Sequence, residues 1–215
     1  MKTPKDPFSI SSRIREGLSR LATAMRVDDW DRAKAAGLNP TQLAILTLLE
    51  GRGETGLGVK EIAAHLGVSQ PTATDSINAL ERKGYLAKRA GETDRRAVRV
   101  VPTADGIAVL QAADAGDGLA ERAIDCLDDR EQEDLLLTLI KMIRHLQQTD
   151  AIPVQRMCVS CRHFAPFAHA DAARPHHCHF VDAAFGQRDL RLDCRDHEEA
   201  DPASRAATRE AFHPG

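Results

Sequence analysis

Four cysteines lie close together in the last third of this 215-residue sequence. Two form a Cys-x-x-Cys pair, and the other two follow after gaps of sixteen and then fifteen residues; they are Cys158, Cys161, Cys178 and Cys194. In a cytoplasm that keeps thiols reduced, clustered cysteines are more often metal ligands than disulfides. Metal binding would also supply folding energy to a segment with few aliphatic residues. We therefore predict one metal centre on these four residues, with Cys126 excluded as an ordinary buried residue.

The spacing leaves two candidates for the metal. Structural zinc sites commonly present two close-spaced ligand pairs, and this segment has one such pair. The pattern Cys-x-x-Cys-x-x-Phe…Cys-x-Phe…Cys resembles that of high-potential iron–sulfur proteins, in which a [4Fe–4S] cluster lies behind aromatic side chains. Phe164 and Phe180 stand at those aromatic positions. The resemblance favours the [4Fe–4S] cluster; zinc is the alternative, completed by a histidine from the set His163, His176, His177, His179 and His197.

A second group of polar side chains lies in SQPTATDSINALERK, residues 69–83. Ala73, Ile77 and Leu80 recur at helical spacing and are expected to pack inward. On a helix in the major groove, the short amide and hydroxyl side chains of the other faces can read base edges or contact phosphates, and cations near the end complement the helix dipole. The predicted DNA-binding residues of this segment are Ser69, Gln70, Thr72, Thr74, Ser76, Arg82 and Lys83.

The surrounding pattern places this segment in a DNA-binding unit. A short apolar-faced helix over 59–66 precedes it, and Gly67 provides the backbone freedom for a tight turn. Two short strands follow, near 85–86 and 98–101, joined by a polar loop that is rich in cations. Two helices, a tight turn and such a hairpin form a helix-turn-helix with a wing.

Three stretches identify the family that this unit resembles: LERKGYLAKR (80–89), Asp94-Arg95-Arg96 and VPTADG (101–106). They are similar to those of the multiple-antibiotic-resistance regulator (MarR) family of winged-helix transcription factors, over roughly residues 8–150. The resemblance implies a homodimer that binds a palindromic operator in double-stranded DNA. It implies no enzymatic activity, and the sequence contains no Gly-rich nucleotide-binding loop and no nucleophile–base arrangement.

The same resemblance assigns roles in the wing. An arginine there can enter the narrow minor groove, where negative potential concentrates. We expect Arg96, together with Arg95, to make this contact and Asp94 to brace one of them. Asp75 departs from the family, which often has a basic residue at this position. Because phosphate repels a carboxylate, operator preference cannot be carried over from relatives.

Composition and charge set further limits. The net charge of −3 excludes a general polyanion binder. Residues 59–103 nevertheless carry eight Lys and Arg against five Asp and Glu, whereas residues 150–201 carry six against nine. There is no apolar run of the length of a membrane span or signal peptide, so we expect a cytoplasmic protein with no membrane partner.

Two helices outside the winged unit carry apolar stripes. The first, over roughly 9–34, contains Ile10, Ile14, Leu18, Leu21 and Met25; the second, over 128–148, contains Leu135, Leu136, Leu139, Ile140, Ile143 and Leu146. These stripes either cover the domain's own core or interlock with a second chain. A two-fold dimer would present two recognition helices to a palindromic site, and we expect this dimer. Gly116 and Gly118 predict a weak point near 114–118.

The predicted fold is mainly α with a small β wing, followed by a small irregular cysteine-rich module. The predicted parts are a flexible arm (1–8), the winged unit with its dimerisation helices (9–150), the metal-binding module (153–200) and a disordered tail (201–215). The leading functional hypothesis is a transcriptional repressor whose metal centre senses redox state, oxygen or iron. The alternatives are a regulator that responds to a small-molecule effector and carries a structural zinc site, and, more remotely, a redox or electron-transfer protein.

Overall fold

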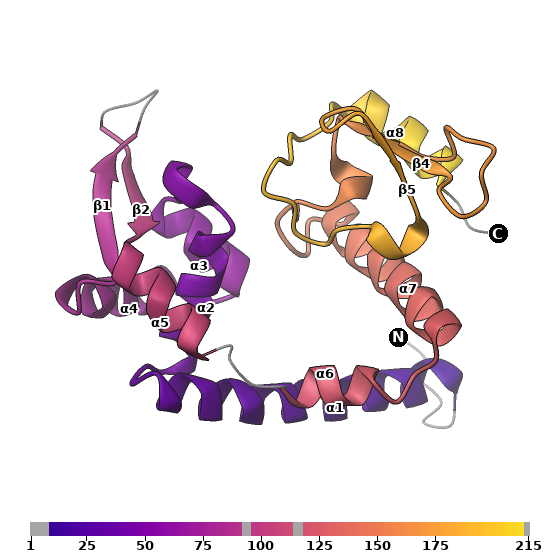
Figure 1. Ribbon diagram of the computed structural model, residues 1–215. Coiled ribbons are helices and arrows are strands. Elements are labelled where there is room, and N and C mark those ends of the chain that lie inside the picture. The colour runs from indigo at the N-terminus through magenta and orange to yellow at the C-terminus, as the bar shows by residue number, and fades with distance from the viewer. Residues whose placement is uncertain (1–8, 92–95, 114–117, 213–215) are drawn as a thin grey trace, which may run out of the picture.

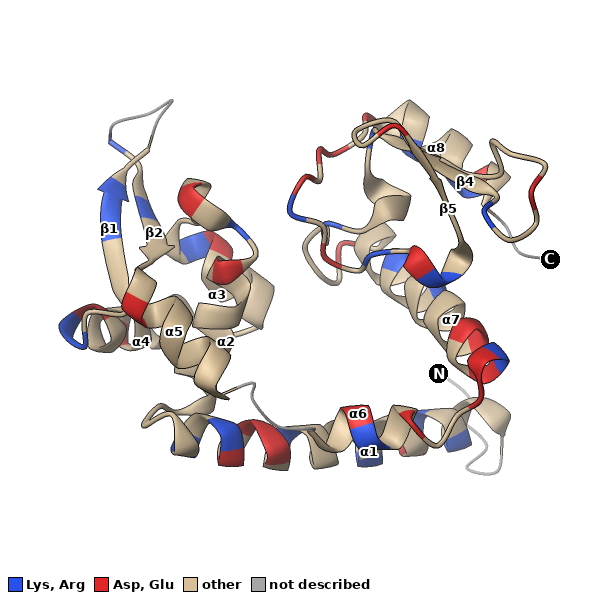
Figure 2. Cartoon of the chain, in the orientation of Figure 1, with Lys and Arg blue, Asp and Glu red and all other residues tan. Residues whose placement is uncertain are grey.

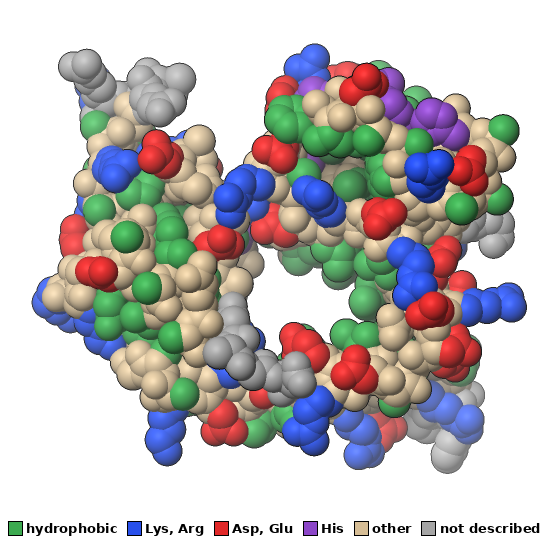
Figure 3. Space-filling model, in the orientation of Figure 1, with side chains coloured by type: hydrophobic (Ala, Val, Ile, Leu, Met, Phe, Trp, Pro, Cys, Tyr) green, Lys and Arg blue, Asp and Glu red, His purple; other side chains and the backbone are tan. Residues whose placement is uncertain are grey.

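The computed structural model describes residues 9–91, 96–113 and 118–212. Two lobes lie on either side of an opening (Figures 1 and 3), and α1 (Ile10–Ala35) runs along one side of that opening beside the short helix α6 (Leu119–Ile124). One lobe holds the winged unit and the other holds the four clustered cysteines. No helix in these described ranges is long and apolar enough to cross a membrane.

The winged lobe has the predicted order of elements. Its members are α2 (Pro40–Glu50), the 3-10 turn η1 (Gly53–Thr55), α3 (Val59–Leu66), α4 (Gln70–Arg82), β1 (Leu86–Ala90), β2 (Val98–Pro102) and α5 (Ala104–Ala113). The strands pair antiparallel, with Leu86 opposite Pro102 and Ala90 opposite Val98. Gly67 makes the turn between α3 and α4 at a φ of +64°, and the Ser69 hydroxyl caps α4 by accepting from the backbone N–H of Thr72. The helix-turn-helix prediction is therefore confirmed.

One apolar core holds this lobe together. The helix α2 is buried on most sides, as its sequence predicts, and it packs against α3, α4, α5 and the strands. The members of this core include Leu43, Ile45, Leu46, Leu49, Ile62, Ile77, Leu80 and Val100. Ala33, near the end of α1, is fully buried in the same core, so α1 is anchored to the winged lobe at its C-terminal end.

The second lobe is built on α7 (Asp129–Gln148). Around α7 lie η2 (Cys158–Ser160), β3 (Phe164–Ala165), β4 (His176–Cys178), β5 (Ala183–Phe185), η3 (Gln187–Asp189) and α8 (Pro202–Ala211). The three strands form an antiparallel sheet in the order β3-β4-β5. The core of this lobe consists of Ile140, Met157, Val159, Phe164, Leu190 and Phe212, and it shares no residue with the first core.

Two predictions about this lobe need correction. Residues 202–211 form a helix rather than a disordered tail, because the Asp201 carboxylate caps it and the 3% exposed Phe212 anchors it in the second core. The apolar surface of α7, which we expected to face a second chain, is also partly covered by the same chain. Ile140 is buried and Ile143 packs beside it, both against the cysteine-rich segment of the same chain.

Some predicted features lie outside the described residues. These are the arm at 1–8, the wing residues Asp94 and Arg95, and most of the weak point at 114–118. On either side of the last gap, α5 ends at Ala113 and α6 begins at Leu119.

Candidate functional site

The first half of α4 presents polar side chains to solvent. Ser69, Gln70, Thr72 and Thr74 are all exposed. The Ser69 and Thr72 hydroxyls bond each other at 2.8 Å, and the Thr74 hydroxyl donates to the Gln70 carbonyl at 2.8 Å. The Gln70 side chain makes no hydrogen bond to any described residue, so its amide is available to read a base.

Ser76 is an exception among the predicted DNA-facing residues. Its exposed fraction is 8%, and it lies with Ala73, Ile77 and Leu80 on the buried face of α4. Positions 73, 76, 77 and 80 follow the i, i+3, i+4, i+7 spacing of one helix face, which explains the burial. The prediction that Ser76 contacts DNA is therefore wrong.

The cations near the end of α4 have different surroundings. Arg82 is exposed, but the Lys83 ammonium donates to the Gly37 carbonyl at 2.6 Å and so ties the end of α4 to the segment before α2. Lys88 in β1 donates to Glu81 at 2.7 Å and holds the hairpin against the same helix. Lys83 therefore makes a contact within the chain, and its predicted role at DNA stays a prediction.

The described part of the wing is cationic (Figure 2). Arg96 is exposed, as the predicted minor-groove contact requires. Arg89 and Arg99 are opposite one another in the hairpin; Arg99 pairs with Glu61 of α3, whereas exposed Arg89 has no ion pair with a described residue. The sequence prediction omitted Arg89, although its position in LAKRA beside the predicted loop was a signal. Asp75 is also exposed and makes no ion pair with a described residue.

The four clustered cysteines line a single cavity of about 140 Å³. Phe164, Phe180 and Phe185 line it as well. Phe164 is nearly buried and Phe180 is half exposed, so one aromatic ring closes the interior side and the other stands at the surface. All four thiols are free. The structure thus brings together all the cysteines predicted as ligands.

Local structure positions each of these thiols. Cys158 begins η2, and Cys161 follows that turn. Cys178 ends β4 directly opposite Phe164 of β3, and the backbone N–H of Cys194 donates to the Arg156 carbonyl at 2.9 Å. Cys126 lies outside the cavity, as predicted, but it is exposed rather than buried.

Arg191 supplies hydrogen bonds to two of the sulfurs. Its backbone N–H donates to Cys158 Sγ at 3.3 Å, and its guanidinium Nη1 lies 3.9 Å from Cys194 Sγ. Burial raises the pKa of the Cys158 thiol, and the N–H of Arg191 partly opposes that rise. Proximity to the three other cysteines raises this pKa further, because four thiolates in one cavity repel each other.

The donor set can be compared with what a single ion and a cluster each need. Among the described residues, no three His, Cys, Asp or Glu side chains are placed to hold one metal ion. Zinc needs its ligands about 2.0–2.3 Å from one point. The 140 Å³ cavity is far larger than the roughly 10–15 Å³ that one water needs. Four thiols, aromatic walls and N–H donors to sulfur match the surroundings of an iron–sulfur cluster.

Four of the five histidines considered as zinc ligands have other polar partners among the described residues. His163 alone among them lines the cavity, and it bonds the Glu198 carboxylate at 3.1 Å. His197 bonds the Ser160 hydroxyl at 3.0 Å, and His177 lies 3.3 Å from the Asp182 carboxylate. His176 is fully buried among aromatic rings, and burial lowers its pKa.

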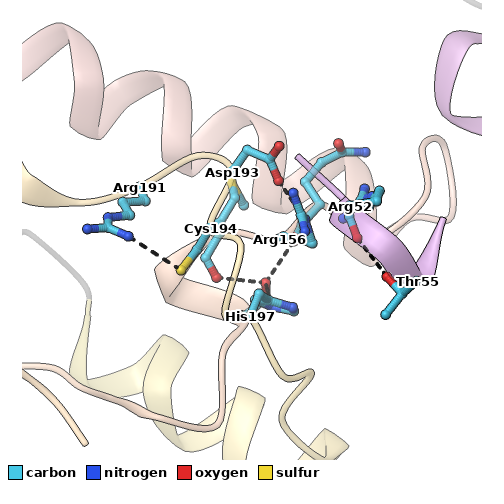
Figure 4. Close-up of polar contacts among 10 residues, drawn as sticks. Arg52, Thr55, Arg156, Arg191, Asp193, Cys194 and His197 are labelled. Atoms are coloured by element: carbon cyan, nitrogen blue, oxygen red, sulfur yellow. Dashed lines mark hydrogen bonds and ion pairs between the residues drawn. The ribbon is translucent and has the colours of Figure 1, made fainter. Parts of the chain in front are cut away.

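Figure 4 shows the polar contacts around Cys194, and the loop that carries this residue also contacts the winged lobe. Arg195 pairs with Glu50 at the end of α2 at 3.0 Å. On the other side of Cys194, Asp193 pairs with Arg156 at 2.7 Å, and this ion pair lies against Gly51. A Cβ on Gly51 would come within 2.7 Å of the Arg156 guanidinium and 2.8 Å of the Asp193 carboxylate, so glycine allows this close approach. We call these contacts of 193–195 with 50–51 the joint.

The joint lies next to the connector that leads into α3. Arg52 follows Gly51, and the Thr55 hydroxyl donates to the Arg52 carbonyl at 2.7 Å. Burial and the charge of Arg156 lower the pKa of the Arg52 guanidinium. The Cys194 loop and the segment that leads into the helix-turn-helix are therefore neighbours in the structure.

Comparison with known proteins establishes the family. The MarR family model matches residues 36–97. The HTH-type transcriptional regulator YkoM of Bacillus subtilis is 33% identical over 116 residues, which are 54% of this chain and 74% of YkoM. The chain belongs to the MarR family. Its relatives are transcriptional regulators rather than enzymes, as the sequence predicts.

Two further MarR comparisons show how far the likeness extends. The transcriptional repressor MprA of Escherichia coli is 32% identical over 73 residues, which are 34% of this chain and only 42% of MprA. The structure of MepR from Staphylococcus aureus in a DNA complex has a TM-score of 0.54 at 22% identity and covers 66% of this chain and all of that chain, so it shows a shared fold. The match of the family model ends at residue 97, well before the clustered cysteines.

Proposed function

We propose that this MarR-type regulator is a repressor whose operator affinity is set by a [4Fe–4S] cluster on Cys158, Cys161, Cys178 and Cys194. The observation that carries this proposal is the one cavity lined by all four thiols. When bound, such a cluster supplies a centre that can change its oxidation state or be lost on exposure to oxygen. The chain's own residues would hold it, shield it and connect it to the DNA-binding lobe.

The support for DNA binding comes from the winged lobe. Gln70, Thr72 and Thr74 are exposed on one helix, and Arg89 and Arg96 are exposed on the hairpin beside it. The relative MprA is a repressor, and MepR, which shares the fold, is seen with DNA. We infer that α4 enters the major groove while the wing reaches an adjacent minor groove.

The support for a dimer comes from an apolar stripe that the chain itself does not cover. On α7 the stripe consists of Leu135, Leu139, Met142 and Leu146, spaced i, i+4, i+7, i+11 as in a coiled-coil seam. Leu135, Met142 and Leu146 are 39–42% exposed. The apolar residues of α1 from Ile10 to Trp30 are exposed as well. We propose that these faces meet the same faces of a second copy, which would place two α4 helices on a palindromic operator.

The joint supports a coupling between the two lobes. Cys194 stands between Asp193 and Arg195, and both neighbours contribute to contacts with α2 or the residue after it. A change in the bonding of Cys194 would displace these neighbours because they are adjacent in the chain. We propose that the joint transmits the state of the cysteine cavity to the helix-turn-helix.

The deciding experiment uses full-length protein purified without oxygen. Iron, acid-labile sulfide and zinc are quantified beside a visible spectrum, and affinity is measured for a duplex selected from a random pool. We expect four iron and four sulfide per chain, visible absorption that air bleaches, and an operator affinity that changes on bleaching. Stoichiometric zinc with no visible absorption would replace the cluster by a structural zinc site. Failure to select any duplex would contradict DNA binding itself.

A further inference from the structure

A second cavity, of about 470 Å³, lies in the cysteine-rich lobe. It is formed by the end of α7, the segment 154–160 and α8, and none of its lining residues lines the cysteine cavity. The polar side chains that matter here are Arg144, Gln147, Ser160, Glu199, Arg205 and Arg209. We call it the arginine pocket.

The charges of the arginine pocket are not balanced. Arg205 pairs with Glu199 at 2.7 Å, which accounts for one of its three arginines. Arg144 and Arg209 make no ion pair with any residue in the described ranges, although Asp150 also lines the pocket. The two guanidiniums are close enough that Arg209, after burial, is the second cause that lowers the pKa of Arg144. Two neighbouring cations repel each other, and neither has an ion pair with a described residue that would offset this repulsion.

Two donors in this pocket also lack acceptors. Arg144 Nη1 and Gln147 Nε2 are buried, and neither finds a hydrogen-bond acceptor in the part of the chain that the structure describes. Buried donors without partners are rare and costly. Arg209 lies in the last turn of α8, where its charge is explained by the helix dipole alone. That explanation does not apply to the buried nitrogen of Arg144, which lies inside the pocket wall.

We propose that the arginine pocket binds a small organic anion whose phosphate or carboxylate group accepts from Arg144 and Gln147 and neutralises Arg144 and Arg209. A guanidinium presents two parallel N–H donors to such a group, and charge-assisted bonds of this kind are the strong ones. The volume suits a molecule of metabolite size rather than a single inorganic ion. Water alone would leave the charges of Arg144 and Arg209 without an ion pair.

The pocket also has a path to the cysteine lobe. Ser160 lines it, donates to the Gln155 and Met157 carbonyls and bonds His197, which follows Cys194 by three residues. Glu199, which pairs with Arg205 in the pocket, is bridged through its backbone to Cys161. An effect of the anion on DNA binding would rest on the proposed function, whereas the binding of the anion itself does not depend on that function.

Binding is measured by calorimetry on the full-length protein at constant ionic strength, with chloride as the reference anion. Citrate represents carboxylates, and glycerol phosphate represents phosphate monoesters. The variants are Arg144→Gln and Arg209→Gln, and the matched control is Lys141→Gln, which removes the same charge from an exposed position of α7 outside the pocket. Arg144→Lys keeps the positive charge but loses the paired N–H donors of the guanidinium. It replaces Arg144→Gln if the neutral variant does not fold.

We expect at least one of the two probes to bind with one site per chain. Each arginine-to-glutamine variant should weaken that binding about tenfold or more. Arg144→Lys should weaken the binding of glycerol phosphate, because the paired N–H donors are lost. Lys141→Gln should bind as the wild type does. Stronger binding of one probe identifies the anionic group. No binding of either probe, or equal binding by the wild type and both arginine variants, would overturn the proposal and leave water as the occupant.

Discussion

Gln70 differs from its neighbours on α4 in having an unengaged side chain. The hydroxyls of Ser69 and Thr72 bond each other and cap the helix, and the Thr74 hydroxyl bonds the backbone of its own helix. These local bonds hold the start of α4 in shape. We therefore expect base reading to fall chiefly to the Gln70 amide, which can bind adenine through two hydrogen bonds.

Replacing Gln70 with alanine should weaken binding to the selected operator by about 1–3 kcal/mol, the scale of one good base contact. Binding to an unrelated duplex should change little, because phosphate contacts carry non-specific affinity. Fluorescence anisotropy with both duplexes measures the difference. Equal losses on the two duplexes would assign Gln70 to the phosphate backbone.

The wing gives a second prediction at the residue scale. Arg96→Ala should weaken specific binding by about 1–3 kcal/mol if Arg96 enters the minor groove. Arg89→Ala should instead lower affinity for all duplexes alike and reduce the salt dependence by about one phosphate contact. The comparison is made by titration at several salt concentrations. An unchanged affinity in Arg96→Ala would remove this residue from the DNA interface.

The winged unit could be predicted from sequence because its signals are local. Gly67, the Ser69 cap and the spacing of Ala73, Ile77 and Leu80 all act within one or two turns. Ser76 was assigned to the wrong face because its polarity was weighed above its position on the helix. The helix α8 was missed for a different reason: Phe212 anchors it by contacts with residues far away in the chain, such as Phe164. The joint depends on Glu50 and Arg195, which are 145 positions apart.

At the scale of elements, α7 has two apolar faces with separate uses. Ile140 and Ile143 pack into the core of the cysteine-rich lobe, whereas Leu139 belongs to the stripe that stays uncovered. The sequence pattern predicted both sets of residues but could not divide them, because the partner of the first face comes from 157–212 of the same chain. This division allows the two roles to be tested separately.

Leu139→Glu should convert the dimer to a monomer, because dimerisation would then bury an unpaired charge. Sedimentation velocity measures the mass, and circular dichroism should show an intact fold. The matched variant Ile143→Glu should instead destabilise the cysteine-rich lobe by about 2–4 kcal/mol. A wild-type protein that sediments as a monomer would contradict the dimer proposal.

The cysteine cavity is the second element that can be tested in isolation, because its lobe has a core of its own. Cys178→Ser and Cys194→Ser should each lose the metal centre and increase hydrogen exchange over 154–197. Exchange in α2 to α4 should stay protected. Cys126→Ser is the control, since this thiol lies outside the cavity. Full metal retention in both cavity variants would contradict the four-cysteine site.

At the scale of the whole molecule, the two cores are connected by two routes. One is the covalent path through α5, α6 and α7. The other is the joint, where the loop around Cys194 meets the end of α2 across the opening seen in Figure 3. The covalent path crosses residues 114–118, most of which lie outside the described ranges. The joint is a non-covalent connection between the loop of Cys194 and the segment that leads into α3.

Breaking the joint should separate sensing from DNA binding. The Arg195–Glu50 pair is largely exposed, so Arg195→Gln should change the free energy of unfolding by only about 0.2–1 kcal/mol. The metal content should also stay unchanged, because Arg195 does not line the cysteine cavity. In the wild type, removal of the metal centre should alter operator affinity by about 5–150-fold, the usual range of coupling between two sites. In Arg195→Gln the ratio of the operator affinities with and without the metal centre should fall towards one.

The reversed pair completes the design. Arg195→Glu combined with Glu50→Arg restores the attraction with opposite polarity, so the double variant should recover most of the wild-type ratio, whereas either single variant repels at the joint and should not. Operator affinity is measured with and without the metal centre for all four proteins. If both single variants keep the full ratio, the signal does not pass through the joint. If the wild type itself shows no ratio, the cluster does not control DNA binding, although the cluster and the DNA interface each remain open to the separate tests above.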